Sequence, residues 1–73
     1  MTQNEKVLNH LRLWGGITTL EAYNYYGITR LSARIKNLRD DGHRILSVQE
    51  IGKNRDGVTV HYTRYILAEQ KGA

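Results

Sequence analysis

Apolar positions in the first 14 residues recur at helical spacing. The stripe runs from Val7 to Trp14, and Thr2 stands three residues before Glu5, which is the spacing of a capping box at a helix N-terminus. Two glycines follow the stripe, and glycine commonly ends a helix because it accepts left-handed backbone angles. The pattern therefore predicts a first helix over residues 1–14.

A second capping box begins at Thr18, with Glu21 three residues later. The short helix that it opens is expected to end at Gly27, where the chain can turn sharply. Ile28 is an apolar residue inside this turn, so we expect it to fill the gap between two helices. The pair that begins at Ile17 can form a one-bridge strand against a later hairpin.

A third helix is predicted from Leu31, Ile35 and Leu38, which lie at i, i+4 and i+7 and so form one buried stripe. Thr29 stands where a capping residue is expected, and Gly42 is expected to end the helix. At about 100° per residue, four positions lie farthest from the stripe. They are Ala33, Lys36, Asn37 and Asp40.

The second half of the chain has β-like texture. Residues 45–51 and 58–66 are rich in β-branched and aromatic side chains, and the polar cluster 52–57 between them contains an Asp-Gly step. They predict one antiparallel hairpin with a basic tip. The fold class is thus α+β, a winged helix-turn-helix of three helices followed by a β-hairpin wing. Residues 1–73 form a single domain in this interpretation, with 68–73 a flexible tail.

Charge is concentrated on the third predicted helix. The chain of 73 residues has a formal net charge of +4, and residues 29–44 contribute five basic and two acidic side chains. Two helices joined by a tight glycine turn, the second of them basic, are the layout of a helix-turn-helix whose second helix enters the DNA major groove. A solvated basic helix is the alternative, because such faces are common.

The N-terminal half of a recognition helix usually faces the base edges. Arg30 can read guanine through a bidentate pair, Asn37 can read adenine or simply face solvent, and Ala33 can meet a thymine methyl group. Basic side chains farther along the helix are better placed for phosphates. The predicted DNA-contacting set is Thr18, Thr29, Arg30, Ser32, Ala33, Arg34, Lys36, Asn37, Arg39, Lys53, Asn54 and Arg55.

Plain structural alternatives also exist for Arg34, for the hairpin tip and for Thr18. Arg34 can pair with a carboxylate such as Glu21 or Asp41. The hairpin tip, residues 53–55, is expected to lie over a minor groove or the DNA backbone. The alternative is an ordinary polar turn, because turns favour the same residue types for their backbone conformation alone. Thr18 can donate to a phosphate, and capping explains it equally well.

The aromatic residues are assigned mostly to packing. Tyr23 and Tyr65 are expected to fill the core, and Trp14 is expected to anchor the first helix to the hairpin. At least one of Tyr25 and Tyr26 must be exposed, where it can mark a surface for a protein partner.

The residue types and their spacing along the chain do not indicate an enzyme or a metal site. The chain has no cysteine, its three histidines fall on different predicted elements, and no glycine-rich phosphate loop is present. We expect no catalytic residues, no metal and no cofactor. No apolar run reaches the ~20 residues of a membrane span, and no signal-peptide stretch opens the chain, so we expect a cytoplasmic protein without a membrane partner.

Nearly the whole chain, residues 2 to 67, resembles the small winged helix-turn-helix proteins of bacteriophages and prophages. The matching stretches are T-Q-N-E-K-V-L-N-H-L, G-G-I-T-T-L-E-A, Y-G-I-T-R-L-S-A-R-I-K-N-L-R-D-D-G-H-R-I and R-Y-I-L. The resemblance implies a DNA-binding domain with its recognition segment from Thr29 to Asn37. The acidic pair Asp40-Asp41 departs from a DNA-binding pattern, since a basic pair would suit phosphates better.

The functional prediction is a phage or prophage transcriptional regulator that binds double-stranded DNA and reads the major groove with its third helix. Specificity from so small a module favours a homodimer or a cooperative array. One alternative keeps the DNA and makes the protein an excisionase-like factor that bends DNA for recombination. The other is a protein-interaction winged helix that docks on, or inhibits, a host or phage protein.

Overall fold

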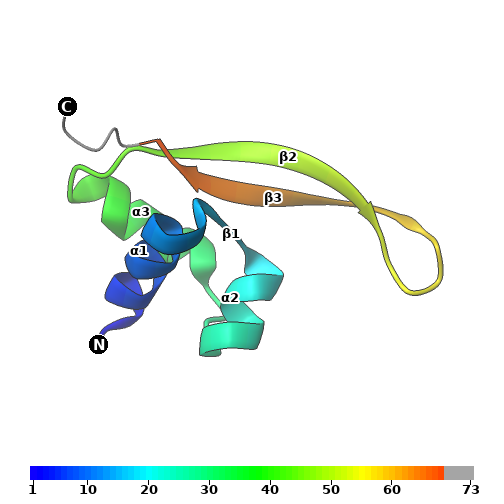
Figure 1. Cartoon of the computed structure of the whole chain (residues 1–73), viewed down its shortest axis with the longest axis horizontal. Helices are drawn as coiled ribbons and strands as arrows, with labels where there is room; N and C mark the ends of the chain where they lie inside the picture. Colours follow the sequence, from blue (N-terminus) through cyan, green and yellow to red (C-terminus); the bar gives the residue numbers. More distant parts are fainter. Residues whose placement is uncertain (69–73) are drawn as a thin grey trace.

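The computed structural model describes residues 1–68, and it has the predicted order of elements (Figure 1). Three helices and a short strand precede a long hairpin, so the predicted fold class is confirmed. The elements are α1 (Gln3–Trp14), β1 (Gly16–Thr18), α2 (Thr19–Tyr26), α3 (Leu31–Asp40), β2 (Ile45–Lys53) and β3 (Thr59–Leu67).

Both predicted capping boxes are present. The Thr2 hydroxyl accepts the Glu5 backbone N–H at 3.1 Å, and the Glu5 carboxylate accepts the Thr2 N–H, which lowers the pKa of that carboxyl. Thr18 and Glu21 repeat the same pair of hydrogen bonds at the start of α2. Each box satisfies two backbone donors that the first helical turn leaves free, which explains why these helices begin where the sequence predicts.

The start of α3 differs from the prediction that Thr29 caps it. The helix begins at Leu31, its capping position is Arg30, and Arg30 forms no side-chain capping hydrogen bond within residues 1–68. Gly27 has a positive φ of 67°, and Ile28 is completely buried directly after it. Burial of Ile28 and Leu31 on the same core fixes the phase of the chain, so tertiary packing overrides the local capping preference at Thr29.

One core joins the three helices to the base of the sheet. Its buried side chains come from all three helices, from β1 and from the turn before α3, and Ile45 adds the first residue of β2. The predicted stripe of α3 is buried as expected. The core residues are Val7, Leu11, Ile17, Ala22, Ile28, Leu31, Ile35, Leu38 and Ile45.

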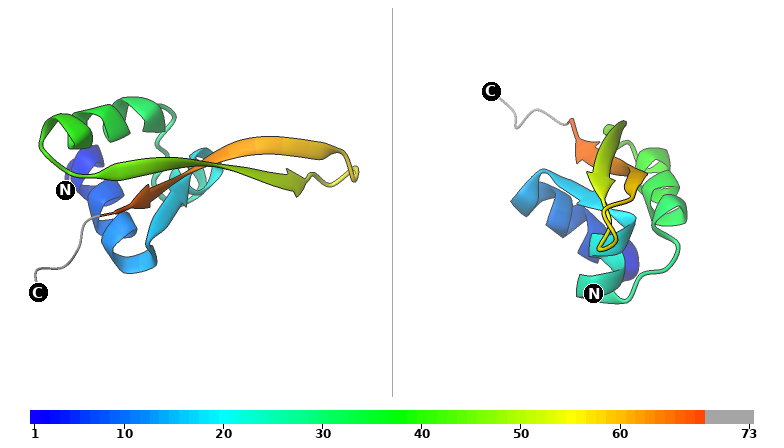
Figure 2. Two further views of the ribbon diagram at one scale, coloured as in Figure 1. Left: turned by 90° about the horizontal axis from the view of Figure 1, so that it is seen from above. Right: turned by 90° about the vertical axis from the view of Figure 1, so that its right-hand side faces the viewer.

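The sheet has the order β1-β3-β2, and all pairs are antiparallel. The short strand predicted at Ile17 is confirmed, because β1 pairs with the end of β3 from Arg64 to Ile66. β2 and β3 pair along their full nine residues and extend beyond the helices (Figures 1 and 2). The molecule is therefore elongated, with a longest axis of 43 Å. At the base, Ala68 donates its N–H to the Arg44 carbonyl at 2.9 Å, while the rest of the predicted tail, 69–73, lies outside the described residues.

Two aromatic predictions are wrong. Tyr23 is 56% exposed and Trp14 is 75% exposed, so neither fills the core nor anchors the hairpin. His10 lies on the buried side of α1. Trp14 lies one turn later, at the end of the helix, where it no longer contacts the core. Tyr65 does pack against the core, and Tyr25 is the exposed member of its pair.

The helices of the described chain are too short or too polar to cross a membrane.

Candidate nucleic-acid interface

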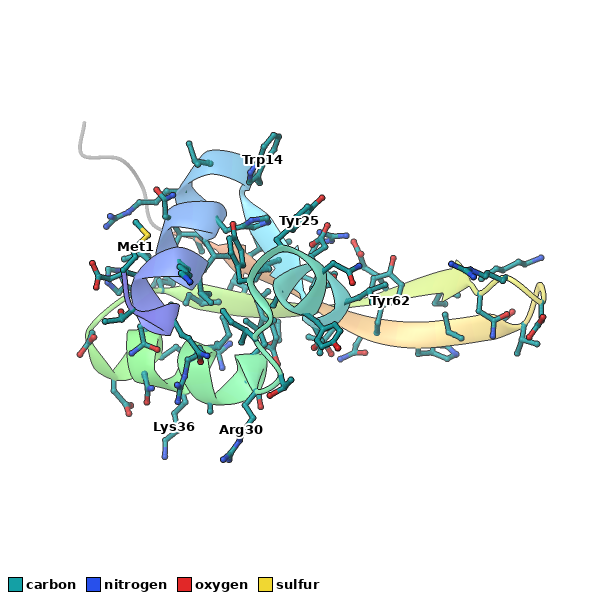
Figure 3. The ribbon with its side chains drawn as sticks, turned by 90° about the horizontal axis from the view of Figure 1, so that it is seen from below. Met1, Trp14, Tyr25, Arg30, Lys36 and Tyr62 are labelled. Atoms are coloured by element: carbon teal, nitrogen blue, oxygen red, sulfur yellow. The ribbon has the colours of Figure 1, made fainter. Side chains whose placement is uncertain are left out.

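The exposed side of α3 is a short polar stripe that begins in the turn before the helix. Arg30, Ser32 and Lys36 are exposed, and the side chains of Arg30 and Lys36 project to the same side, free of the body of the molecule (Figure 3). Arg30 and Ser32 stand at the start of the helix, where recognition helices meet base edges, and Lys36 follows about one turn later. The stripe therefore has the position and the charge that reading a major groove requires.

The exposed stripe is rotated from the one predicted by helical spacing. Ala33, Arg34 and Asn37 are half-buried, whereas Ser32 and Arg39 are exposed. The rotation has a clear cause, because α1 packs along the side of α3 that carries positions 34 and 37. A core stripe of three residues does not reveal that second neighbour, so the true outward direction lies nearer Lys36 than Asn37.

Two predicted contact residues on that side bind the first turn of α1. The Asn37 amide donates to Asn4 Oδ1 at 3.5 Å, and Arg34 Nη1 donates to Gln3 Oε1 at 3.4 Å. Both bonds are long, at the limit of useful hydrogen bonding. Glu21, one of the two carboxylates considered as a partner of Arg34, pairs with Arg64 instead. The Nε of Arg34 is buried without an acceptor among residues 1–68, so this guanidinium retains unused donor capacity.

Arg39 is tied to the sheet. Its Nε and Nη2 donate to the Ile45 carbonyl at 3.0 and 2.7 Å, and Nη2 also reaches Ser47 Oγ at 3.0 Å. These bonds join the last turn of α3 to the first residues of β2. Arg39 therefore has a structural role in addition to the phosphate contact that the sequence suggests for it.

The wing tip is built by Asn54. Its Oδ1 accepts the backbone N–H groups of Asp56 and Val58, each at 3.0 Å, and its own N–H donates to the Val58 carbonyl. The Asn54 side chain thus satisfies backbone N–H groups within the turn, as Asn side chains commonly do in turns. Its neighbours Lys53 and Arg55 are exposed, and they supply the positive charge at the tip.

A groove of about 810 Å³ brings the helix-turn-helix and the wing together. Its polar rim includes Thr29 from the turn before α3 and Lys53 and Asn54 from the wing. Thr18 also lines it, but this residue is buried and its hydroxyl accepts the Glu21 N–H, so capping accounts for it. The groove shows that residues from two distant parts of the predicted contact set lie around one concave surface.

Arg64, which the sequence analysis did not single out, links the wing to α2. Its Nε donates to Glu50 Oε1 at 2.9 Å and its Nη1 to Glu21 Oε1 at 3.1 Å. The hydrogen bond that Arg64 donates to Glu50 contributes most to raising the pKa of Arg64 above its ordinary value. Glu50 lies diagonally across the hairpin from Arg64, because Glu50 pairs with Tyr62 and Arg64 pairs with Val48. This contact could be found only with the strand register in hand.

A second surface lies on the side of the molecule away from Arg30 and Lys36 (Figure 3). His10 is its buried centre, and the rings of Trp14, Tyr25 and Tyr26 stand within 6.4 Å of the His10 ring. His10 Nδ1 and the Tyr26 hydroxyl share a hydrogen bond of 2.7 Å. Burial lowers the pKa of His10; nearby Glu21 opposes that shift and Arg64 adds to it. These rings line a shallow groove of about 560 Å³.

Comparison with known proteins yields one match. Residues 2–70 match the model of the family described as "Winged helix-turn-helix domain". No curated protein and no solved structure matches the chain significantly.

Proposed function

The chain belongs to the winged helix-turn-helix domain family, and on that premise we propose that it binds double-stranded DNA with α3 in the major groove. The wing tip lies over the adjacent backbone or minor groove in this proposal. We assign the biological role of a transcriptional regulator of phage or prophage origin, acting in the cytoplasm. Family membership suggests the DNA partner, and the resemblance noted in the sequence favours the regulatory role.

One observation carries the proposal. The start and middle of α3 present Arg30, Ser32 and Lys36 to solvent, and the exposed basic residues Lys53 and Arg55 stand at the tip of the wing. A basic helix and a basic hairpin tip on one molecule can supply positive charge to phosphates along two neighbouring grooves of a duplex.

The residues of the predicted contact set divide into base-reading and phosphate-binding roles. Arg30 is assigned to guanine O6 and N7, Ala33 to a thymine methyl group, and Lys36 to a phosphate. Arg34 joins a phosphate by exchanging its long bond to Gln3 for a charge-assisted one. The flanking contacts are assigned to Thr29, Ser32, Asn37, Arg39, Lys53, Asn54 and Arg55, whereas the predicted contact residue Thr18 is buried and keeps its capping role.

Binding to duplex DNA at two salt concentrations tests this proposal. The purified protein is titrated with mixed-sequence duplex, and a random pool is then selected for bound sequences. We expect affinity to fall steeply with salt and one motif to be enriched. Lys36→Ala should reduce the salt slope by about 1, whereas Arg12→Ala, which removes the same charge from α1, should leave it unchanged. Absence of binding at low salt would exclude the DNA proposal.

A protein-interaction role is the second candidate, and the aromatic surface favours it. Trp14 and Tyr25 are mostly exposed, although aromatic rings of this size usually pack against protein. If the protein acts by docking on a host or phage protein, changing Tyr25 and Tyr26 should abolish partner binding. Reversing the charges of Arg30 and Arg34 should then leave it intact. An excisionase-like role would instead be recognised by strong bending of the bound DNA.

A further inference from the structure

The groove of about 810 Å³ between α2 and the wing, called the α2–wing groove below, has mostly apolar and aromatic walls. Leu20 and Tyr23 lie one helical turn apart on α2, line the groove, and are 67% and 56% exposed. Tyr62 of β3 lines it from the wing, beside α2 (Figure 3). None of these three residues belongs to the predicted DNA-contacting set. Exposed apolar side chains that gather around one concave surface indicate a binding site.

The wing side of the α2–wing groove is held in a fixed shape. The Tyr62 ring lies over Gly52 of the neighbouring strand, where an added Cβ would be 3.1 Å from Tyr62 Cε1. Gly52 therefore leaves room for the ring to lie against β2. Tyr62 is still 38% exposed, so part of the ring remains available to a ligand. An aromatic ring that is already ordered loses little conformational entropy on binding.

The two ends of the α2–wing groove belong to the two elements proposed to face DNA. Thr29, directly before Arg30, lines one end, and Lys53 and Asn54 of the wing tip line the other. In a duplex, one sugar–phosphate strand separates the major groove from the adjacent minor groove. With α3 in the major groove and the wing tip over the minor groove, that strand has to cross the α2–wing groove.

The chemistry of the lining fits such a strand. Glu21 and Arg64 both line the groove and are joined at 3.1 Å, so their charges largely cancel. Lys53 adds a positive charge at the wing end. A DNA strand alternates negative phosphates with deoxyribose rings, whose carbon atoms offer apolar surface. An apolar wall with a positive end therefore suits the sugars and a phosphate together.

We propose that the α2–wing groove binds the deoxyribose rings of this strand, with Tyr23 and Tyr62 packed against them. This assignment rests on the proposed DNA-binding function and adds a preference for DNA over RNA. A ribose at the same position would press its 2′-hydroxyl against an apolar wall, where the hydroxyl loses water without gaining a hydrogen-bond partner.

Two alanine variants test the packing on the duplex selected from the random pool. Tyr62→Ala and Tyr23→Ala should each weaken binding about 5- to 10-fold, because each removes apolar contact area. The salt slope should stay unchanged, since neither variant removes a charge. If Tyr62 only held the wing in position, its loss would also lower the salt slope, because Lys53 and Arg55 would lose their phosphates. A lowered slope would therefore overturn the direct contact.

Each variant has a matched control that lies outside the α2–wing groove. Tyr25→Ala removes a ring of the same kind from α2, where Tyr25 is 67% exposed on the aromatic surface. Ile51→Ala removes an apolar side chain that is 70% exposed on the other side of the wing from Gly52. Both controls should keep the native affinity for the duplex.

A ribonucleotide scan supplies a second readout. Single ribonucleotides are placed one at a time along each strand of the selected duplex. Binding of the native chain should weaken at one or two adjacent positions of one strand per bound copy, and Tyr62→Ala should reduce that loss. Native affinity in both tyrosine variants, with no ribonucleotide-sensitive position, would overturn this inference and leave DNA binding intact. Failure of the native chain to bind any duplex would overturn both.

Discussion

Arg30 stands at the junction between the turn and α3, and its side chain is free to meet a ligand. It occupies the capping position without a side-chain capping bond among the described residues, and it projects away from the molecule. Replacement by alanine should therefore cost little stability. It should cost about 1–3 kcal/mol of binding to the selected DNA site and relax the preference at one base position. Competition binding with single-base variants of the site measures both effects. Unchanged affinity and specificity would contradict the docking of α3 described above.

His10 makes folding stability depend on pH. Burial lowers its pKa in the folded protein, so the unfolded chain binds a proton more readily. The contribution of His10 to the free energy of unfolding is therefore fully present above its ordinary pKa of about 6.5. This contribution is lost as the pH falls from there through the lowered pKa of the folded protein. Thermal unfolding at pH 7.5 and pH 5.5 should show a lower midpoint at the acidic pH. His10→Gln should reduce that difference, and an equal difference in both proteins would contradict this account.

Residues governed by near neighbours in sequence were predictable. Thr2 and Thr18 cap their helices because each partner glutamate lies three residues away. Trp14 and Asn37 were not predictable, because their surroundings are set by where α1 ends and by how α1 lies along α3. His10 lies at helical spacing from Val7, and that spacing is the signal that could have placed it in the core.

At the scale of elements, the wing is held to α2 through one guanidinium. Arg64 bonds Glu50 on β2 and Glu21 on α2, and the same Glu21 oxygen accepts the Thr18 N–H at 2.9 Å. The network joins the start of α2 to the middle of the hairpin. The relative placement of α3 and the wing tip therefore depends on this contact, although neither DNA-facing element contains Arg64.

Arg64→Met keeps much of the side-chain volume and removes the charge. We expect a stability loss of about 1 kcal/mol, since the pairs are partly exposed. We also expect the effect of Arg55→Ala on DNA binding to shrink in the Arg64→Met background, because a loosely held wing contributes less. A double-mutant cycle measures this coupling, with Arg12→Met as the control for lost charge. Additive effects of the two changes would show that Arg64 does not position the wing.

Helix periods and the hairpin were visible in the sequence, but their mutual placement was not. The spacing of Leu31, Ile35 and Leu38 identified the buried stripe of α3. It could not reveal that α1 also covers the side of α3 that carries Asn37, since periodicity reports one average direction. The strand register, and with it the contact between Arg64 and Glu50, likewise depends on pairing between distant residues.

At the scale of the whole molecule, distinct surfaces point in different directions. The basic stripe of α3 lies on one side, and the aromatic surface around Trp14 and Tyr25 lies on the other (Figure 3). Net charge and the basic third helix predicted the first surface. The aromatic surface was predicted only in part, since one of Tyr25 and Tyr26 was expected to be exposed but Trp14 was expected to anchor the first helix to the hairpin.

The most direct test of DNA recognition is to map amide chemical shifts by NMR while a selected duplex is added. The DNA-binding account predicts that the largest changes fall on residues 29–36 at the start of α3 and on residues 53–55 at the wing tip, with little change around Trp14 and Tyr25. Changes confined to the aromatic surface, or no changes at low salt, would contradict it.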